Sequence, residues 1–575
     1  MRLFADQIAR ALALATGLPQ SEIKIELPRD PAHGDLAFPC FPIAKAQKRP
    51  PPAVASELAG KLAIEGVSVS VLGPYLNFRI DRSVLARAVL SEIESKGAQY
   101  GSASIGTGKT VVIDFSSPNI AKPMHVGHIR STILGASLRR VFAFLGYRVV
   151  GINHIGDWGA QFGGLVVAIR RWRKDVDLER DPVQGLLELY QRSKKAAEED
   201  PQFDSEAKAA YQELESGKDG EVRALWRWVT EVSLRGFDKT YKRLGIEHEL
   251  VRGESFYEPF LEPTIRRVEQ AGVAEISQGA LVVTLGGIEK SLAETPCLLR
   301  QSNGTTLYAT RDLAGLFHRW DEFHFERCLY VVGGEQKLHF RQLKGVLKRM
   351  QLDWEPRVEH IDFGLLLGPG RVKLASRKGE VLVLDDLVDD VVEEAKRILA
   401  EKQAALEPAE RLPEAQLVEV AESVGIGALV FNDQKRERIK DVLFDKAEIL
   451  SFEGDTGPYL QYTHARFTRI LSKAATAGQG AGAPDWTLLA EAGPILIQLA
   501  RFPDVVRSAA ERCEPSELAQ YLLALCRELN NWYREHRVLD QEAALTASRL
   551  ALVRASKIVV SNGLRLLGLR APEQM

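Results

Sequence analysis

Residues 110–119 read Thr110-Val111-Val112-Ile113-Asp114-Phe115-Ser116-Ser117-Pro118-Asn119. The first six are mainly apolar and β-branched, which predicts a buried strand, and the polar residues after them predict a loop. Apolar residues then recur at helical spacing from Ile129 to Leu145, and Gly146 stands where such a helix would end. Another strand is expected over residues 148–153. This strand–loop–helix–strand unit predicts an α/β domain.

Two histidines occupy the start of the expected helix, in the sequence His125-Val126-Gly127-His128. Free backbone N–H groups and the dipole at a helix N-terminus favour a phosphate, and Gly127 lets a flat base approach the backbone. The pattern therefore predicts a nucleotide triphosphate site. On these four residues alone a pair of structural histidines remains open, whereas a zinc site is disfavoured because no third ligand stands at zinc spacing.

The segment before the first strand, Gly106-Thr107-Gly108-Lys109-Thr110, is similar to a P-loop but is not one. Residue 103, where the pattern needs glycine, is alanine, and a P-loop follows a strand whereas this segment precedes one. The Gly- and Ser-rich residues 96–109 instead indicate a linker. They predict a separate N-terminal domain, with strands over residues 23–27 and 75–80.

The composition is that of a multidomain globular protein. The 575 residues are 45% hydrophobic and 26% charged, with a net charge of −2, so any face that binds nucleic acid has to be local. No apolar segment is long enough to span a bilayer, and residues 1–10 predict a docked amphipathic helix rather than a signal peptide. The five cysteines form no C-x-x-C pair, which is typical of buried thiols in a reducing compartment. We expect a cytoplasmic protein.

Two segments resemble the catalytic entrance of the arginyl-tRNA synthetases, a class I family: residues 116–128, which contain the two histidines, and residues 153–163, Asn153-His154-Ile155-Gly156-Asp157-Trp158-Gly159-Ala160-Gln161-Phe162-Gly163. Residues 125–128 match the "HIGH" signature of that family. The resemblance implies a multidomain α/β fold: a Rossmann-like class I core with a connective insertion, a small N-terminal α+β domain and a C-terminal all-α anticodon-binding bundle. The activity it implies is ATP-dependent activation of L-arginine and transfer to the 3′ end of arginine tRNA.

The linkers and the resemblance predict four parts. Residues 1–105 form an N-terminal domain that in the family touches the tRNA elbow. Residues 106–395 form the catalytic domain, interrupted by an insertion at about 166–300. Residues 396–454 form a helical connection, and residues 455–575 the helical anticodon-binding domain. The insertion is too short for a large editing domain, which agrees with a guanidinium site that rejects analogues by leaving buried charges unpaired.

The resemblance implies an arginine pocket formed by Asp114, Asn119, Tyr308, Asp312 and Gln336. A planar cation with five donors is bound well by carboxylates, which Asp114 and Asp312 supply. Asp114 departs from the glutamate that many members of the family carry. From the residues alone, Tyr308 and Asp312 are equally consistent with a core aromatic and a helix cap.

For ATP, the resemblance implies binding by His125, Gly127, His128, Gly333, Lys373 and Arg377, with Mg²⁺ accompanying ATP and no metal site in the protein. The K-M-S-K loop of class I enzymes corresponds to Lys373-Leu374-Ala375-Ser376-Arg377-Lys378-Gly379, in which Ser376 replaces the second lysine. Lys122 is our candidate for the missing cation; Lys373, Arg377 or Lys378 alone is the alternative. We expect catalytic roles for His125, His128, Lys122 and Lys373.

Two other functions compete with this interpretation. One is a class I enzyme with another substrate, which the acidic pair Asp114 and Asp312 disfavours. The other is an inactive RNA-binding paralogue, which the two intact histidines disfavour. Basic residues among aromatics over residues 501–570 suit single-stranded RNA, and they suit ordinary amphipathic helices as well. The expected partners are arginine tRNA, L-arginine and ATP, with no membrane, and the chain is expected to be a monomer.

Overall fold

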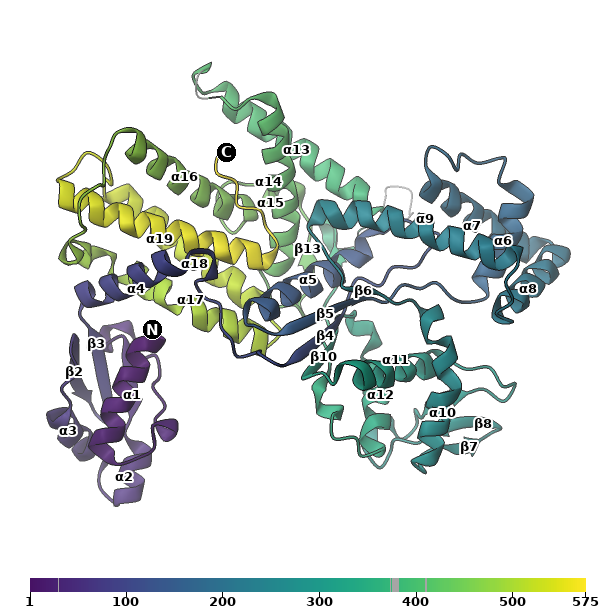
Figure 1. Cartoon of the computed structure of the whole chain (residues 1–575), viewed down its shortest axis with the longest axis horizontal. Coiled ribbons are helices and arrows are strands. Elements are labelled where there is room, and N and C mark those ends of the chain that lie inside the picture. The colour runs from purple at the N-terminus through teal and green to yellow at the C-terminus, as the bar shows by residue number, and fades with distance from the viewer. Residues whose placement is uncertain (29, 373, 375–381, 409–410) are drawn as a thin grey trace.

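The computed structural model describes residues 1–575 except 29, 373, 375–381 and 409–410. Figure 1 places an N-terminal domain at the lower left, a central sheet flanked by two lobes on the right, and a helical bundle at the upper left. Each part is built from elements that follow one another nearly in order along the chain.

The N-terminal domain begins with α1 (Arg2–Thr16), the amphipathic helix predicted from sequence, and contains α2 (Phe41–Gln47) and α3 (Pro51–Lys61). Its antiparallel sheet has the order β1-β3-β2, from β1 (Leu36–Pro39), β2 (Val67–Leu72) and β3 (Tyr75–Ile80). The strand predicted over residues 75–80 is confirmed. The strand predicted over residues 23–27 is wrong, because only Glu26 pairs, in an isolated bridge to Ala37, and Pro28 lacks the N–H to extend the ladder.

The central sheet has five parallel strands in the order β11-β10-β4-β5-β6. These strands are β4 (Thr110–Asp114), β5 (Arg148–Asn153), β6 (Leu250–Val251), β10 (Arg327–Tyr330) and β11 (Val358–His360). The chain moves from β4 to β5 on one side and later returns to β10 on the other side of β4. The carboxyl ends of β4 and β10 therefore form a switch point, where open α/β sheets bind ligands.

The strand–loop–helix–strand unit is confirmed by β4, β5 and the helix between them, α5 (Ile129–Phe144). Val111, Val112 and Ile113 are fully buried, as expected for a parallel strand covered on both faces. The other helices next to the sheet are α6 (Gln161–Trp172), α11 (Tyr308–Phe323) and α12 (Lys337–Arg349). α6 follows β5 and the 3₁₀ turn before α12 follows β10, so the N-termini of these two elements lie at the carboxyl edge of the parallel sheet.

The segment between β5 and β10 forms the two lobes on the right of Figure 1. One lobe is helical, with α7 (Pro182–Glu199), α8 (Pro201–Glu215) and α9 (Glu221–Leu244) packed on α6. The chain then returns to the sheet as β6 before it enters the other lobe. That lobe contains the 3₁₀ segment η5 (Glu254–Phe260), α10 (Leu261–Gln270) and an antiparallel sheet of β7 (Glu275–Ser277), β8 (Ala280–Val283) and β9 (Cys297–Arg300).

The C-terminal part is largely helical, and a two-stranded parallel pair, β12 (Leu366–Leu367) with β13 (Val442–Leu443), ties it to the sheet region. Its helices are α13 (Leu384–Ala404), α14 (Glu414–Gln434), α15 (Lys446–Ile449), α16 (Gly457–Thr476), α17 (Gly493–Glu511), α18 (Ser516–Glu535) and α19 (Ala543–Leu567). Together with the N-terminal α+β domain and the parallel sheet, this bundle confirms the predicted fold class.

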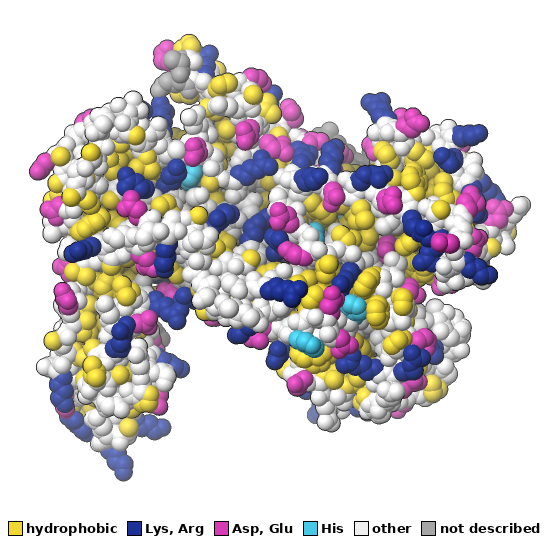
Figure 2. Space-filling model, in the orientation of Figure 1, with side chains coloured by type: hydrophobic (Ala, Val, Ile, Leu, Met, Phe, Trp, Pro, Cys, Tyr) yellow, Lys and Arg dark blue, Asp and Glu magenta, His cyan; other side chains and the backbone are white. Residues whose placement is uncertain are grey.

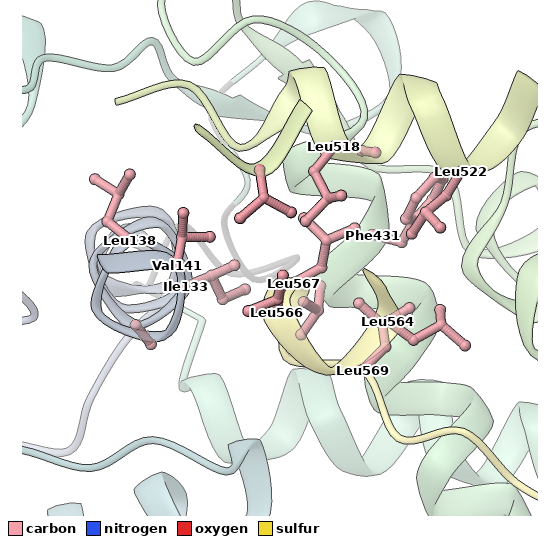
Figure 3. Close-up of a cluster of buried hydrophobic side chains, with 14 of the residues drawn as sticks. Ile133, Leu138, Val141, Phe431, Leu518, Leu522, Leu564, Leu566, Leu567 and Leu569 are labelled. Carbon is pink, nitrogen blue, oxygen red and sulfur yellow. The ribbon is translucent and has the colours of Figure 1, made fainter. Parts of the chain in front are cut away.

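The catalytic helix α5 and the C-terminal bundle share one hydrophobic core (Figure 3). Ile133, Leu138 and Val141 of α5 belong to the same buried cluster as Leu566 and Leu567 at the end of α19. The Ser137 hydroxyl also donates to the Leu566 carbonyl at 3.0 Å. Burying a leucine side chain contributes about 1.5–3 kcal/mol, so this junction makes the bundle part of the catalytic scaffold.

Charge on the visible face is dispersed. Figure 2 shows Lys and Arg side chains interspersed with Asp and Glu over much of this face. The five cysteines are free and buried, which confirms their predicted state. None of the helices in the described part of the chain is both long and apolar enough to cross a membrane.

Candidate active site

His125 caps the 3₁₀ turn η4 (Val126–His128) at the entrance to α5 and His128 ends it, and the two ring centroids are 3.8 Å apart. His125 Nδ1 accepts the N–H of Gly127 at 3.1 Å, and His128 Nδ1 accepts the N–H of His125 at 3.1 Å. A ring nitrogen that accepts a backbone N–H carries no proton. Each neutral imidazole therefore keeps its proton on Nε2, where it can donate to a ligand.

Burial keeps these imidazoles neutral. Burial, together with the charges of His125 and Lys122, lowers the pKa of His128 to about 3. Burial also lowers the pKa of His125, and the Lys122 ammonium lowers it further. At neutral pH both rings are thus neutral hydrogen-bond donors beside a lysine that carries the positive charge.

The loop between β4 and η4 has an uncommon backbone. Ser116, Ser117 and Ala121 have φ angles of 75°, 53° and 62°, in the left-handed region that non-glycine residues rarely adopt. Ser131 of α5 fixes the loop, because its Oγ accepts the N–H of Ser116 at 2.9 Å and donates to the Val331 carbonyl at 2.6 Å. Strain of this kind persists where the surroundings impose it, and it clusters at functional sites.

A cavity of about 310 Å³ opens beside this loop. Its walls come from the loop itself, the start of α6, helix α7, η5 and the first turn of α11. Six of its lining residues bear on the chemistry: Asn119, Lys122, Tyr190, Glu254, Tyr308 and Arg311. A larger cavity of about 480 Å³ lies along the later turns of α11 and is lined by none of the predicted site residues.

Comparison with known proteins agrees with the sequence motifs. A family model described as "tRNA synthetases class I (R), catalytic domain" matches residues 89–446, and models of the "Arginyl tRNA synthetase N terminal domain" and the "DALR anticodon binding domain" match residues 2–80 and 460–575. The chain belongs to the arginyl-tRNA synthetase family. The resemblance found in the sequence is thereby confirmed.

Full-length relatives extend this family match. The arginine–tRNA ligases of Lactobacillus johnsonii and Exiguobacterium sibiricum are 40% and 41% identical to the chain, and each alignment covers 100% of both proteins. Among solved structures, the arginyl-tRNA synthetase of Thermus thermophilus has a TM-score of 0.81 at 27% identity, again over 100% of both chains. The match to the N-terminal, catalytic and anticodon-binding models accounts for most of the chain.

The structure brings three residues of the predicted site into the cavity: Asn119, Lys122 and Tyr308. Asn119 lies tightly against Gly156, where an added Cβ would come within 1.9 Å of the Asn119 Oδ1. Gly156 therefore has to be glycine for Asn119 to take this position. Tyr308 is the first residue of α11 and is two-thirds exposed at the cavity.

The two predicted carboxylates each have a partner within the protein in this synthetase. Asp114 is 4% exposed; its Oδ2 accepts from Arg319 Nη2 at 2.7 Å and its Oδ1 from the Ser117 hydroxyl at 3.0 Å. Asp312 Oδ2 lies 2.6 Å from His339 Nε2. Neither lines the cavity, so the structure does not bring them together there as a bidentate pair.

The remaining predicted residues lie past β10 or outside the described residues. Gly333 precedes the turn η7 (Gly334–Gln336), and Gln336 at its end is exposed. Lys373 and Arg377 lie outside the described residues, as do Ser376 and Lys378. The chain directly after them is anchored to the histidine motif: Val126 donates to the Leu382 carbonyl at 3.0 Å, and Leu384 donates to the Met124 carbonyl at 2.9 Å.

Glu254 is a site residue that sequence reasoning missed. It lines the cavity, is 6% exposed and accepts a hydrogen bond from Tyr308. Burial raises the pKa of Glu254, and the hydrogen bond from Tyr308 and the charge of Arg311 oppose that rise. Its signal in the sequence is weak: it follows β6, a two-residue strand, at the carboxyl edge of the sheet where ligands bind.

Proposed function

We propose that the 310 Å³ cavity and the adjoining histidine motif bind L-arginine and ATP for the reaction of the family: activation of arginine as its adenylate, then transfer to the 3′ end of arginine tRNA. The observation that carries the proposal is Glu254, a buried carboxylate at a cavity that also holds Asn119, Tyr308 and the ammonium of Lys122. A buried carboxylate and an ammonium in one cavity fit the guanidinium of arginine and the phosphates of ATP.

The guanidinium is proposed to bind at Glu254 and Tyr308. A buried carboxylate is costly unless it is paired, and Arg311, the nearest cation to it on α11, forms an ion pair with Glu258. A substrate guanidinium would supply the missing charge and donate along its planar edge. Asn119 and Gln336 are proposed to contact the rest of the amino acid. Asp312, which contacts His339, lies on the same helix as Tyr308 and is proposed to contribute its carboxylate to the arginine pocket.

Asp114 is proposed to act on arginine from the end of β4, next to the strained loop. In this conformation its carboxylate is held by Arg319 and Ser117, so any contact with the substrate would be shared with them. Arg319 is itself buried, with its guanidinium 4.9 Å from the centre of the Tyr330 ring. Asp114 is thus the member of the proposed pocket whose role rests most on the family resemblance.

The triphosphate is proposed to lie along η4. The Nε2–H groups of His125 and His128 would donate to phosphate oxygens, Lys122 would supply the charge, and Gly127 and Gly333 would leave room for the adenosine. The arginine carboxylate attacks the α-phosphorus in line, and pyrophosphate departs. Preorganised donors at the oxygens where charge develops, rather than covalent catalysis, would supply the rate. Lys373 and Arg377 are proposed to act on the same phosphates.

Mg²⁺ is proposed to enter with ATP. No group of three or more His, Cys, Asp or Glu residues able to hold a metal ion occurs within the described part of the chain. The phosphate oxygens of ATP would supply most of the ligands, as is usual for this cation, which keeps several waters and few protein ligands.

The arrangement of parts is proposed to follow the sequence-based division: an N-terminal domain to residue 105, the catalytic domain with its insertion to 395, a helical connection to 454 and an anticodon-binding bundle beyond it. We propose a monomer that works in the cytoplasm. These statements rest on the family and on the composition of the chain.

The deciding experiment is tRNA charging. Purified protein with ATP, Mg²⁺ and total tRNA is expected to attach arginine and none of the other standard amino acids, each tested separately with a radioactive label. Preferential, stable charging of any other amino acid would refute the proposal. Loss of arginine charging in a variant lacking both imidazoles, His125→Ala with His128→Ala, would locate the activity at this motif.

A further inference from the structure

The ammonium of Lys122 rests on an aromatic ring from the insertion. Its Nζ lies 4.2 Å from the ring centroid of Tyr190, on helix α7. Both residues line the 310 Å³ cavity. An ammonium at this distance over a ring face is attracted by the ring quadrupole, and the attraction is stronger where water is partly excluded.

Lys122 has no carboxylate partner among the residues that the structure describes. Many of the other lysines form ion pairs, for example Lys61 with Glu57 and Lys96 with Glu92. Its positive charge nonetheless acts within the site, since it lowers the pKa of both His125 and His128. The contact with the Tyr190 ring therefore fixes the position of the Lys122 ammonium.

An aromatic ring is better suited to this task than a carboxylate. An aspartate or glutamate in its place would neutralise the ammonium and compete with phosphate oxygens for it. The ring attracts the ammonium without cancelling its charge, and a lysine stem with four rotatable bonds gains a defined position. The charge then stays available to an anion.

We propose that Tyr190 is a positioning residue: it holds the Lys122 ammonium beside the histidine motif, ready for the phosphates of ATP, so that helix α7 of the insertion takes part in arginine activation. This inference rests on the proposed role of Lys122 at the triphosphate. It gives the insertion a function in the chemical step beyond packing on α6.

The same ring offers a matched control. Lys194, one turn further along α7, has its Nζ 5.4 Å from the Tyr190 centroid, but it is exposed and does not line the cavity. If any lysine near the ring sufficed, Lys194 would matter as much as Lys122. If the ring positions a charge at the cavity, substitution of Lys122 lowers the rate of activation and substitution of Lys194 does not.

The experiment is a double-mutant cycle on arginine activation. Activation is measured as pyrophosphate exchange in the presence of arginine tRNA. The variants are Lys122→Met, Tyr190→Leu, Tyr190→Phe, the double variant Lys122→Met/Tyr190→Leu, and Lys194→Met. Tyr190→Leu is expected to lower kcat about three- to tenfold with little change in the KM for arginine. Tyr190→Phe keeps the ring and should retain most of the rate. The double variant should be no slower than Lys122→Met alone.

Four outcomes would overturn the inference, and thermal unfolding of each variant excludes loss of folding as their cause. Losses from Lys122→Met and Tyr190→Leu that multiply would place Tyr190 on the substrate itself. A Tyr190→Leu variant as fast as the parent, alongside a slow Lys122→Met, would remove Tyr190 and leave the proposed function intact. An unchanged Lys122→Met would remove the role of Lys122, and the inference with it. A Lys194→Met variant as slow as Lys122→Met would also count against it.

Discussion

Glu254 is the residue on which the proposed specificity depends most, because its carboxylate is buried at the cavity and the hydrogen bond from Tyr308 and the charges of Arg311 and His154 offset only part of the cost. Glu254→Gln keeps the shape and removes the charge. We expect the KM for arginine to rise about ten- to hundredfold, which corresponds to the loss of a charge-assisted hydrogen bond worth about 1.5–3 kcal/mol. The KM for ATP should change little. Steady-state pyrophosphate exchange would measure both constants.

A suitable control is Glu262→Gln, which breaks an exposed ion pair with Arg300 outside the cavity. It should leave both constants near their original values. An unchanged KM for arginine in Glu254→Gln would remove this carboxylate from the pocket and return Asp312 and Asp114 as the main candidates.

His128 makes a prediction about acid stability. Its pKa is about 3 in the folded protein against an ordinary 6.5, so between these values the unfolded chain binds a proton that the folded chain does not. Stability must therefore fall as the pH drops from 6.5 towards 3, by up to about 1.4 kcal/mol for each pH unit from this group. Above pH 6.5 the imidazole is neutral in both states and has no effect.

The change that tests this is His128→Gln, which keeps a hydrogen-bonding side chain and removes the titration. Urea unfolding at pH 7 and at pH 4.5 gives the loss of stability on acidification for each protein. We expect that loss to be smaller in His128→Gln than in the parent. Equal losses would mean that His128 titrates normally and that the imidazole is not held neutral by burial.

At the scale of elements, the α5–α14 junction holds an ion pair that is almost fully buried. Arg130, in the first turn of α5, donates through Nε to Asp433 Oδ1 at 2.6 Å and through Nη1 to the Lys440 carbonyl at 3.0 Å. Asp433 lies near the end of α14, and burial raises the pKa of its carboxyl group, while Arg130 opposes the rise. The pair fixes α5, the helix that directly follows His128, against α14.

Removing one partner of this pair should lower the free energy of unfolding by more than removing both partners together. Arg130→Met or Asp433→Leu alone leaves a buried charge unpaired, and we expect each to lower the free energy of unfolding by about 3–5 kcal/mol. The double variant replaces the pair by apolar side chains and should lose less than the sum of the two. Urea unfolding followed by circular dichroism measures the three values. Losses that simply add would show that the two side chains do not interact.

Elements with strong local signals were predictable, and weak ones were not. The β-branched run of β4 and the helical spacing of α5 act through neighbouring residues, so their positions followed from the sequence alone. The two residues of β6 carry no such signal, because the strand exists only through its pairing with β5. The expected strand at residues 23–27 failed for the opposite reason: its apolar pattern was present and its partner ladder was not.

The same distinction applies to the site. Asn119 and Lys122 could be predicted because they lie in the loop that leads into the motif. The Asp114–Arg319 contact joins residues 205 positions apart, and the contact between Tyr190 and Lys122 joins the insertion to the core. Glu254 stands in a charged region where a solvated carboxylate is the ordinary expectation. Only the three-dimensional arrangement turns it towards the cavity.

At the scale of the whole molecule, the hydrophobic core around α5 is completed by side chains of the C-terminal bundle. The apolar cluster in Figure 3 lies between α5 and the ends of α14, α18 and α19, and the N-terminal region joins the same cluster through α1 and α4 (Arg82–Lys96). The Met1 amino group donates to the Ala500 carbonyl at 2.7 Å, and Tyr100 donates to the Leu499 carbonyl at 3.0 Å. The N-terminal domain is thus packed on the C-terminal bundle, and the bundle in turn is packed on α5.

A chain that ends at residue 454 should therefore fail as an independent catalytic unit. Removing residues 455–575 would expose Ile133, Val141 and Phe431, and a contiguous apolar surface of that kind leads to aggregation. We expect the truncated protein to aggregate or to unfold without a cooperative transition, and to lack pyrophosphate exchange even when arginine tRNA is supplied. Size-exclusion chromatography and calorimetry measure the first two properties. A soluble, cooperatively folding fragment with measurable exchange would show that the bundle serves tRNA binding alone and that α5 needs no support from it.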